Sequence, residues 1–165
     1  MFFDEAGFGR ISKPKSCWIT GQIRPSVPCH HIREYRYAFG AVDPHDGEKF
    51  FIAAPRCNSD WTHRFFDELS QAYPNDHIIL VMDNATWHKS KQLPIPDNIE
   101  RMFIPPYTPE MNPIEQIWTE IRKSFANKLF KTLADVMEQL YEAVQNLSND
   151  TVKSITGRKW LIDLI

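Results

Sequence analysis

Short apolar runs that end in turn residues predict the strands of a β-sheet. These runs lie at residues 2–3, 35–42, 48–54, 77–82 and 99–104. The runs at 35–42 and 48–54 are joined by DPHDG, a strong turn sequence, so we expect a hairpin there. Phe2-Phe3 is typical of the end of a short strand that enters a loop at Asp4. The run at 77–82 is continuously apolar, which favours a central strand covered on both faces.

Three longer stretches carry the apolar spacing of amphipathic helices. The first begins with Ser59 or Asp60 as its cap, the second has Asn112 as cap and Pro113 at its first position, and the third has Thr132 as cap. Their apolar stripes are Trp61, Phe65, Leu69 and Ala72 in the first, Ile117, Trp118, Ile121 and Phe125 in the second, and Leu133, Val136, Met137, Leu140 and Val144 in the third. A short helix is expected at 86–92, and the tail from residue 148 is either a last helix or a docking segment.

The order of these elements predicts an α/β fold: a mixed sheet flanked by helices, in a single domain over residues 1–165. Functional residues of such sheets gather at the carboxyl ends of the strands. Asp4 and Asp83 each follow an apolar strand in this interpretation. If the two strands are neighbours, both carboxylates reach one edge of the sheet.

Composition narrows the classes of function. The chain has 165 residues and a net charge of −2, so a wholly basic surface is absent and a polyanion would be met by local patches or metal ions. Cys17, Cys29 and Cys57 show no CxxC spacing, and we expect reduced thiols in a cytosolic protein. We see no targeting segment and no apolar run long enough to cross a membrane, so we expect a soluble protein.

A third acidic residue, Glu115, opens the helix that follows the proline-rich loop 104–113. It lies beside the buried stripe of that helix, at the border between core and solvent. Clustered with Asp4 and Asp83, it would raise the pKa values of all three carboxyl groups unless a divalent cation lay among them. Carboxylates and phosphate oxygens both bind Mg²⁺, and two such ions about 3.5–4 Å apart support phosphodiester chemistry.

Each acid also has an ordinary structural interpretation. Asn112 and Glu115 have the spacing of a capping box, in which Glu115 only bonds the backbone of the cap. Asp83 is part of a common strand-to-turn sequence, and Asp4 is uninformative by itself. The combination favours chemistry, because two strand-end aspartates and one helix-start glutamate fit a single geometry.

The motifs at these positions resemble the catalytic domain of DDE transposases. They are DE at 4–5, DNATWH at 83–88 and PPYTPEMNPIEQIW at 105–118. The resemblance is to the mariner superfamily, in its bacterial insertion-sequence 630 branch, and it covers nearly the whole chain. It implies a ribonuclease H-like fold in which Asp4, Asp83 and Glu115 form the catalytic, metal-binding triad.

The resemblance also implies an activity and partners. Members of this family use Mg²⁺ or Mn²⁺, here as two ions, to cut double-stranded DNA at transposon ends and to join the freed 3′ hydroxyl to target DNA at TA dinucleotides. We expect self-association in the active complex. Family members normally carry an N-terminal helix-turn-helix region that binds the terminal repeats, and some encode it in a separate reading frame. We expect this chain to be the catalytic domain without that region. We expect a cytoplasmic bacterial protein that is found at the nucleoid when active.

Other residues are candidates for supporting roles beside the triad: Glu5, Asn84, His88 and Asn112. Basic side chains that could contact DNA phosphates are Lys13, Lys15, Arg24, Lys89, Lys91, Arg122 and Lys123. Two alternative functions stay open. One is a catalytically silent transposase remnant that acts as a DNA-binding or dimerising regulator, and the other is a different ribonuclease H-like nuclease.

Overall fold

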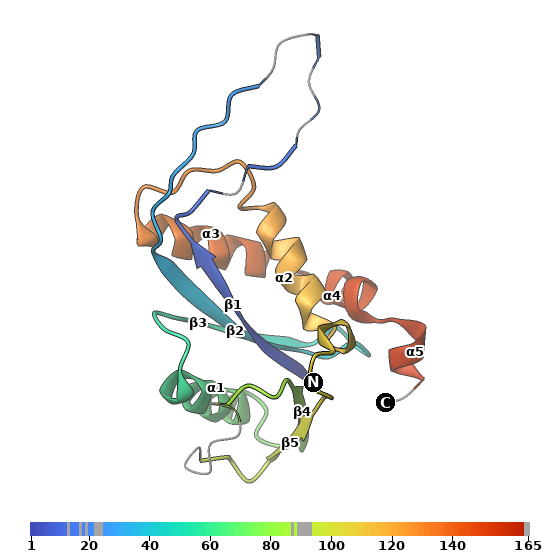
Figure 1. The fold of residues 1–165 in the computed structure, drawn as a ribbon. Helices are drawn as coiled ribbons and strands as arrows, with labels where there is room; N and C mark the ends of the chain where they lie inside the picture. Colours follow the sequence, from blue (N-terminus) through green and yellow to red (C-terminus); the bar gives the residue numbers. More distant parts are fainter. Residues whose placement is uncertain are drawn as a thin grey trace.

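Five strands form one mixed sheet in the order β3-β2-β1-β4-β5 (Figure 1). The computed structural model describes residues 1–12, 14–16, 18, 20–21, 25–86, 88 and 94–163. The strands are β1 (Phe2–Gly9), β2 (Tyr35–Val42), β3 (Lys49–Ala54), β4 (Ile78–Met82) and β5 (Ile99–Phe103). β1, β2 and β3 form an antiparallel meander, and β4 and β5 run parallel to β1. The predicted hairpin is therefore confirmed.

Helices cover both faces of this sheet (Figure 1). They are α1 (Ser59–Ala72), α2 (Ile114–Lys123), α3 (Leu133–Gln145), α4 (Asn149–Thr156) and α5 (Lys159–Ile162), with a 3₁₀ turn η1 (Pro109–Met111) before α2. α1 packs on one face, where Phe3 and Phe39 of the sheet contact Phe65 and Phe66 of the helix. α2, α3 and α4 cover the other face. The α/β fold with a mixed sheet flanked by helices is confirmed.

Alternation along β1 decides which side chain reaches which face of the sheet. Phe2 and Phe8 lie in the core beneath α2, whereas Phe3 lies in the core beneath α1. Asp4 and Glu5 are consecutive, so they point to opposite faces: Asp4 toward α2 and Glu5 toward α1.

β1 is longer than predicted, and Asp4 does not end it. The strand pairs with β2 along its whole length, from Phe2 opposite Val42 to Gly9 opposite Tyr35. The expectation that a loop begins at Asp4 is wrong, since this residue is the third of an eight-residue strand. Its small and acidic residues are held extended because β2 supplies partners for their backbone groups.

The expectation of a central, doubly covered strand at 77–82 is also wrong. β1 is the middle strand, and β4 lies between β1 and the edge strand β5. Ile79 of β4 is 44% exposed, so this face is open there. A short seam joins β4 to β1: the Val81 amide donates to the Met1 carbonyl at 2.9 Å, and the Met1 amine donates to the Ile79 carbonyl at 2.9 Å.

Local capping signals are confirmed in α3 and shifted by one residue in α1. Thr132 forms a reciprocal capping box with Asp135, which fixes the start of α3. Asn58 caps α1, one residue before the predicted Ser59, and Ala72 is exposed rather than part of the apolar stripe. The buried residues of α1 are Thr62, Phe65, Phe66 and Leu69, and those of α2 are Ile114, Ile117, Trp118 and Ile121.

The tail from residue 148, which the sequence left open, forms α4 and α5. Val152 and Leu161 are buried in the same core as α2. Between β1 and β2 the chain leaves the sheet over residues 10–34. The described ends of this segment run side by side, since the amide of Ser12 donates to the carbonyl of His30 at 3.0 Å.

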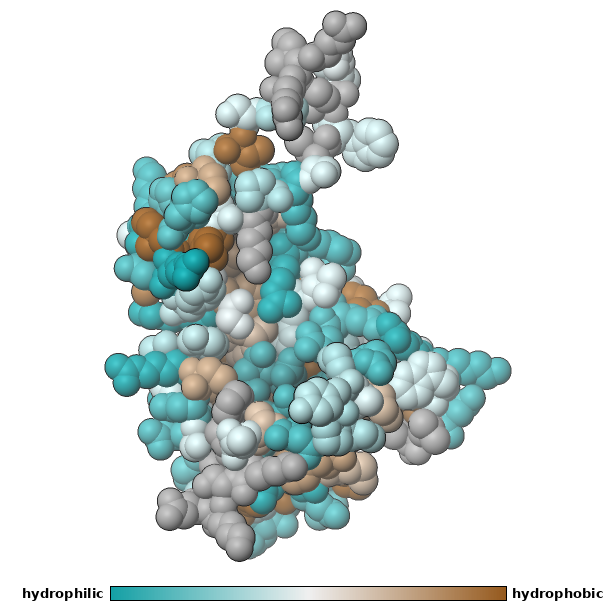
Figure 2. All heavy atoms as spheres, viewed as in Figure 1, coloured by the Kyte–Doolittle hydropathy of each residue, from teal (hydrophilic) through white to brown (hydrophobic). Residues whose placement is uncertain are grey.

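The helix expected at 86–92 falls largely outside the described residues. Among the residues that the structure describes, Cys29 and Cys57 are free thiols. The surface seen in Figure 2 is mostly hydrophilic, with scattered apolar side chains. No helix in the described part of the chain has the length and apolar character needed to cross a membrane.

Candidate active site

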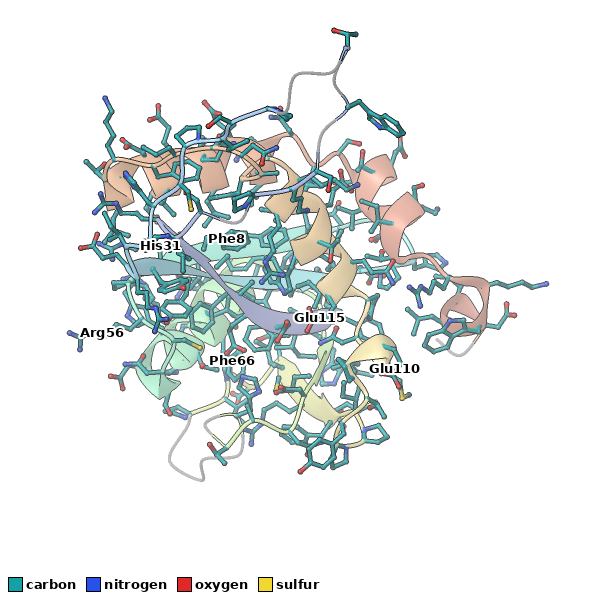
Figure 3. The ribbon with its side chains drawn as sticks, turned by 45° about the horizontal axis from the view of Figure 1, so that its top comes forward. Phe8, His31, Arg56, Phe66, Glu110 and Glu115 are labelled. Atoms are coloured by element: carbon teal, nitrogen blue, oxygen red, sulfur yellow. The ribbon has the colours of Figure 1, made fainter. Side chains whose placement is uncertain are left out.

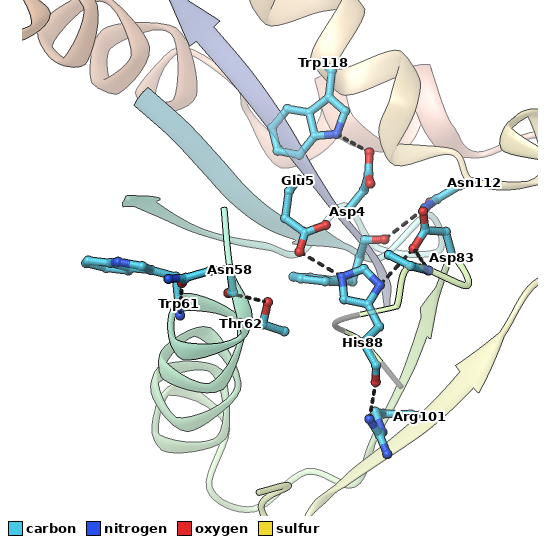
Figure 4. Close-up of polar contacts among 12 residues, drawn as sticks. Asp4, Glu5, Asn58, Trp61, Thr62, Asp83, His88, Arg101, Asn112 and Trp118 are labelled. Carbon is cyan, nitrogen blue, oxygen red and sulfur yellow. Dashed lines mark hydrogen bonds and ion pairs between the residues drawn. The ribbon is translucent and has the colours of Figure 1, made fainter. Parts of the chain in front are cut away.

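Three acidic side chains from three elements line one pocket of about 430 Å³. Asp4 comes from β1, Asp83 follows the end of β4, and Glu115 lies in the first turn of α2. The rest of the wall is formed by the loop 104–109 together with Asn84, Ala85 and Asn112. The parallel pairing of β1 with β4 brings the two aspartates to one place, and α2 crosses above them (Figures 3 and 4).

Asp4 is held in an environment that disfavours its charge. Its Oδ2 accepts a hydrogen bond from Nε1 of the buried Trp118 at 2.9 Å (Figure 4). Burial, and then the negative charges of Glu115 and Glu5, raise the pKa of Asp4 from 3.8 to about 7, against the opposing effect of the Trp118 bond. Burial is the largest cause of this shift, and of the predicted repulsion between the three acids the part from Glu115 contributes to it. A cation in the pocket would relieve both effects.

Asp83 is supported from behind by a buried histidine. Nδ1 of His88 lies 2.8 Å from Oδ1 of Asp83, and Nε2 of His88 lies 2.8 Å from Oε1 of Glu5 (Figure 4). The side chains of His88 and Glu5 are 1% and 6% exposed, whereas that of Asp83 is 51% exposed. Glu5 lies on the α1 face of the sheet and outside the described lining of the pocket, so it influences Asp83 through its contact with His88.

Two flanking carboxylates favour the imidazolium form of His88. Burial by itself lowers the pKa of His88, but the hydrogen bond and charge of Glu5 and the charge of Asp83 raise it by more. The amide of Ala85 also donates to Oδ1 of Asp83 at 2.9 Å. Oδ1 of Asp83 is thus fixed by its neighbours while the carboxylate stays half open to the pocket.

Glu115 is exposed, not partly shielded as predicted. The capping-box interpretation is wrong as well, because Asn112 does not cap α2. Nδ2 of Asn112 instead donates to the Phe3 carbonyl at 2.9 Å, and Pro113 occupies the cap position without a side-chain bond. Within the described residues, Oδ1 of the buried Asn112 accepts no hydrogen bond.

The proline-rich loop that leads to Glu115 is fixed along its length. Nδ2 of Asn84 donates to the Ile104 carbonyl, and Oγ1 of Thr108 donates to the Pro105 carbonyl at 2.6 Å. Each proline fixes its own φ, and the residue before it is pushed toward extended backbone. The loop therefore presents Glu115 with little conformational freedom left to lose.

The described basic residues expected to contact DNA lie away from this pocket. Lys15 and Arg122 line a different pocket at the far end of β1, where the guanidinium of Arg122 lies 5.5 Å from the ring centre of Phe8. Figure 3 shows Glu115 of α2 beside one end of β1 and Phe8 toward the other end. Lys123 pairs with Glu120 on the surface of α2. The other four candidates fall outside the described residues: Lys13, Arg24, Lys89 and Lys91.

The donor set of the pocket suits a hard divalent cation. Such ions prefer carboxylate and amide oxygens, which Asp4, Asp83, Glu115 and Asn112 offer. Across the described ranges no three acidic, histidine or cysteine side chains are already arranged to hold a metal ion. Glu115 is exposed, so its side chain can turn toward an ion next to the half-buried Asp4, while Asp83 is held through Oδ1 and stays half open to the pocket.

Comparison with known proteins agrees with this geometry. The family model described as "DDE superfamily endonuclease" matches residues 1–137. The chain belongs to this family. A curated relative of this chain is the uncharacterized protein y4pE/y4sA of Sinorhizobium fredii (strain NBRC 101917 / NGR234). The two are 33% identical over 130 residues, which span 76% of this chain and 96% of the relative.

Solved structures of the Mos1 transposase share the fold. The Mos1 paired-end complex with the left transposon end matches 94% of this chain with a TM-score of 0.70 and 14% identity. The Mos1 mariner paired-end complex with Mn matches 98% of this chain with a TM-score of 0.67 and 15% identity. This chain spans about half of those chains, 50% and 52% respectively. The predicted ribonuclease H-like architecture is confirmed.

Sequence reasoning missed the role of one residue in the candidate site. Trp118 was expected only as part of a buried stripe, but its indole also donates to Asp4. The signal was present, because a buried tryptophan needs an acceptor for its N–H. Trp118 lies three residues after Glu115, on the face of α2 that packs on β1.

Proposed function

We propose that this DDE endonuclease is the catalytic domain of a transposase that cleaves DNA strands and transfers them with the help of divalent metal ions. The observation that carries the proposal is the single pocket lined by Asp4, Asp83 and Glu115. Family membership and the shared fold with Mos1 support it. Within that fold we assign the chain to the insertion-sequence 630 branch of the mariner superfamily, on the sequence motifs around the three acids.

The residues divide the work at the pocket. Asp4, half-buried and bonded to Trp118, provides one carboxylate, and the exposed Asp83 and Glu115 complete the ligand set. When bound, two Mg²⁺ or Mn²⁺ ions supply activation of the attacking oxygen and stabilisation of the leaving oxygen. Asn112 ties the start of α2 to β1 through the Phe3 carbonyl, which keeps Glu115 beside Asp4.

The named relatives suggest partners for this domain. The Mos1 structures include a paired-end complex with a transposon end and a strand transfer complex, and two of them carry Mn or Mg. We propose double-stranded DNA as substrate, with transposon ends and TA target sites, and self-association in the active complex. We propose that recognition of the ends is supplied by an N-terminal DNA-binding region, encoded with this domain or in a separate frame, in the bacterial cytoplasm.

Metal-dependent nicking of supercoiled plasmid DNA tests the proposal. The chain should nick the plasmid in Mn²⁺ and not in EDTA, and Asp83→Asn should abolish nicking because it removes one ligand charge. Glu138→Gln is the matched control, since Glu138 is exposed on α3, away from the pocket. If Asp83→Asn nicks as fast as the parent chain, the three acids are not the active site.

The silent-regulator alternative is favoured by one observation: no ready-made metal site exists among the described side chains. Calorimetric titration with Mn²⁺ separates the two functions. The transposase predicts binding that Asp83→Asn weakens, whereas a remnant predicts no binding to either chain. A different ribonuclease H-like nuclease would bind metal but prefer RNA–DNA hybrids or branched DNA, which a panel of substrates would reveal.

A further inference from the structure

Tyr107 occupies an unusual place at the rim of the acidic pocket. It lies in the middle of the loop that leads to η1, and its side chain is 100% exposed. Its backbone φ is +63°, in the left-handed region, where a bulky residue is a clear outlier. The backbone on either side is held by the Thr108 bond to Pro105 and by the amide of Met111, which donates to the Thr108 carbonyl at 3.0 Å.

Nothing in the described part of the fold accounts for a tyrosine at this position. Glycine or asparagine would adopt a positive φ with less strain. A fully exposed ring gains nothing from burial in a core, and an exposed tyrosine could be replaced by a polar residue without loss of packing. Strained residues of this kind occur at ligand-binding sites, where a group outside the chain gives the side chain its purpose.

The chemistry of the pocket indicates what that group is. The titratable side chains in the described lining of the pocket are three acids and Tyr107 itself, with no lysine or arginine among them. The site therefore repels a nucleic-acid backbone except where metal ions lie. An aromatic ring is uncharged, so it can attract a base by stacking without neutralising the acids that hold the metal.

We propose that Tyr107 stacks on a base of the DNA strand whose phosphate enters the acidic pocket, and so positions that strand. The proposal rests on the proposed function, because it takes DNA as the ligand. The proline-rich loop fixes the backbone around Tyr107, so the ring is presented with little freedom to lose on binding. The ring, not the hydroxyl, makes the contact, since stacking uses the face of the aromatic system.

The test measures binding of a duplex with a short single-stranded 3′ tail that carries 2-aminopurine, whose fluorescence falls on stacking. Binding is followed in Ca²⁺, and nicking of supercoiled plasmid is followed in Mn²⁺ with the same preparations. Tyr107→Gly should weaken binding about 5- to 150-fold, the range for loss of one base–aromatic stack, and should abolish the fluorescence change. Tyr107→Phe and Tyr107→Trp should stay within about twofold of the parent chain, because a ring remains.

Two controls keep the result interpretable. Tyr141 is 66% exposed on α3, and Tyr141→Ala should leave binding unchanged. Glycine accepts the positive φ of this position, so Tyr107→Gly should unfold at the same temperature as the parent chain or higher. Thermal unfolding followed by circular dichroism checks this.

The stacking proposal is overturned if Tyr107→Gly binds as tightly as the parent chain, or if Tyr107→Phe loses as much as Tyr107→Gly. It is also overturned if Tyr107→Gly changes only the sedimentation of the protein, since the ring would then contact a second copy. The failure of the two proposals can be told apart. If the parent chain never nicks DNA but binds the 2-aminopurine duplex, and Tyr107→Gly loses that binding, stacking is supported while the proposed catalysis fails. If the parent chain nicks DNA, and Tyr107→Gly binds and nicks as the parent does, only the stacking proposal is overturned.

Discussion

Asp4→Asn should stabilise the metal-free protein at high pH and have a smaller effect at low pH. The substitution keeps an oxygen that can accept the Trp118 hydrogen bond but removes a charge that burial, Glu115 and Glu5 disfavour. The folded-state pKa of Asp4, about 7, lies above its ordinary value of 3.8. The stability that protonated Asp4 provides is therefore fully present below about pH 4 and is lost as the pH rises through about 7.

The size of the effect follows from these two pKa values. The interval between 3.8 and about 7, at about 1.4 kcal/mol for each pH unit, corresponds to about 4 kcal/mol of unfolding free energy. By linkage, the parent chain loses roughly 1.5 kcal/mol of this by pH 5 and nearly all of it by pH 8. The difference in unfolding free energy between Asp4→Asn and the parent chain should therefore be about 2.5 kcal/mol larger at pH 8 than at pH 5, in favour of the variant.

Urea unfolding in EDTA at pH 5 and pH 8 measures this difference. Asp97→Asn is the matched control, because Asp97 is exposed in the turn before β5 and its substitution should change stability little at either pH. Addition of Mn²⁺ at pH 8 should stabilise the parent chain more than Asp4→Asn, since the cation replaces the proton. An equal effect of Asp4→Asn at pH 5 and pH 8 would refute the claim that this carboxyl group is strained in its charged form.

Two further substitutions test the supports of the site and of the fold. His88→Gln leaves the buried Glu5 without its imidazolium partner and should cost about 3–5 kcal/mol in urea unfolding at pH 6, a loss that adding Glu5→Gln should partly restore. Because the pKa of His88 is raised above 6.5, the stabilisation from the His88–Glu5 pair is fully present below pH 6.5 and fades as the pH rises through the raised pKa. If His88→Gln loses as much unfolding free energy at pH 9 as at pH 6, the ion pair is contradicted. Thr132→Ala should lower the midpoint of thermal unfolding through a loss of about 1 kcal/mol, whereas Thr132→Ser should not, and equal melting of the two would argue against the capping box of α3.

Local signals were sufficient for elements whose stability is decided within a few residues. The Thr132–Asp135 box and the turn between β2 and β3 are of this kind, since each is built from neighbouring side chains and backbone groups. The start of α1 was missed by one residue because Asn58 and Ser59 are consecutive, and both residue types are good caps. Periodicity cannot distinguish between such neighbours.

The parts of the fold and site that the sequence did not predict depend on contacts between residues far apart in the chain. β1 continues past Asp4 because β2 pairs with it, and these partners lie 26 to 34 positions away in sequence, from Gly9 opposite Tyr35 to Glu5 opposite Phe39. The exposure of Ile79 follows from the place of β4 in the sheet, which its apolar run does not encode. The three acids were identified from motifs, but the contact of His88 with Glu5 depends on a chain reversal that no local pattern specifies.

The seam between β1 and β4 has a consequence for when this domain is competent. Asp4 lies on β1, while Asp83 follows β4, and the two strands are joined by these few backbone hydrogen bonds and by the apolar core that both share beneath α1. Any loosening of the seam would move Asp83 relative to Asp4 and would also disturb that shared core. An ion that bound both carboxylates would hold the seam closed, so metal binding and the stability of the sheet would be thermodynamically linked.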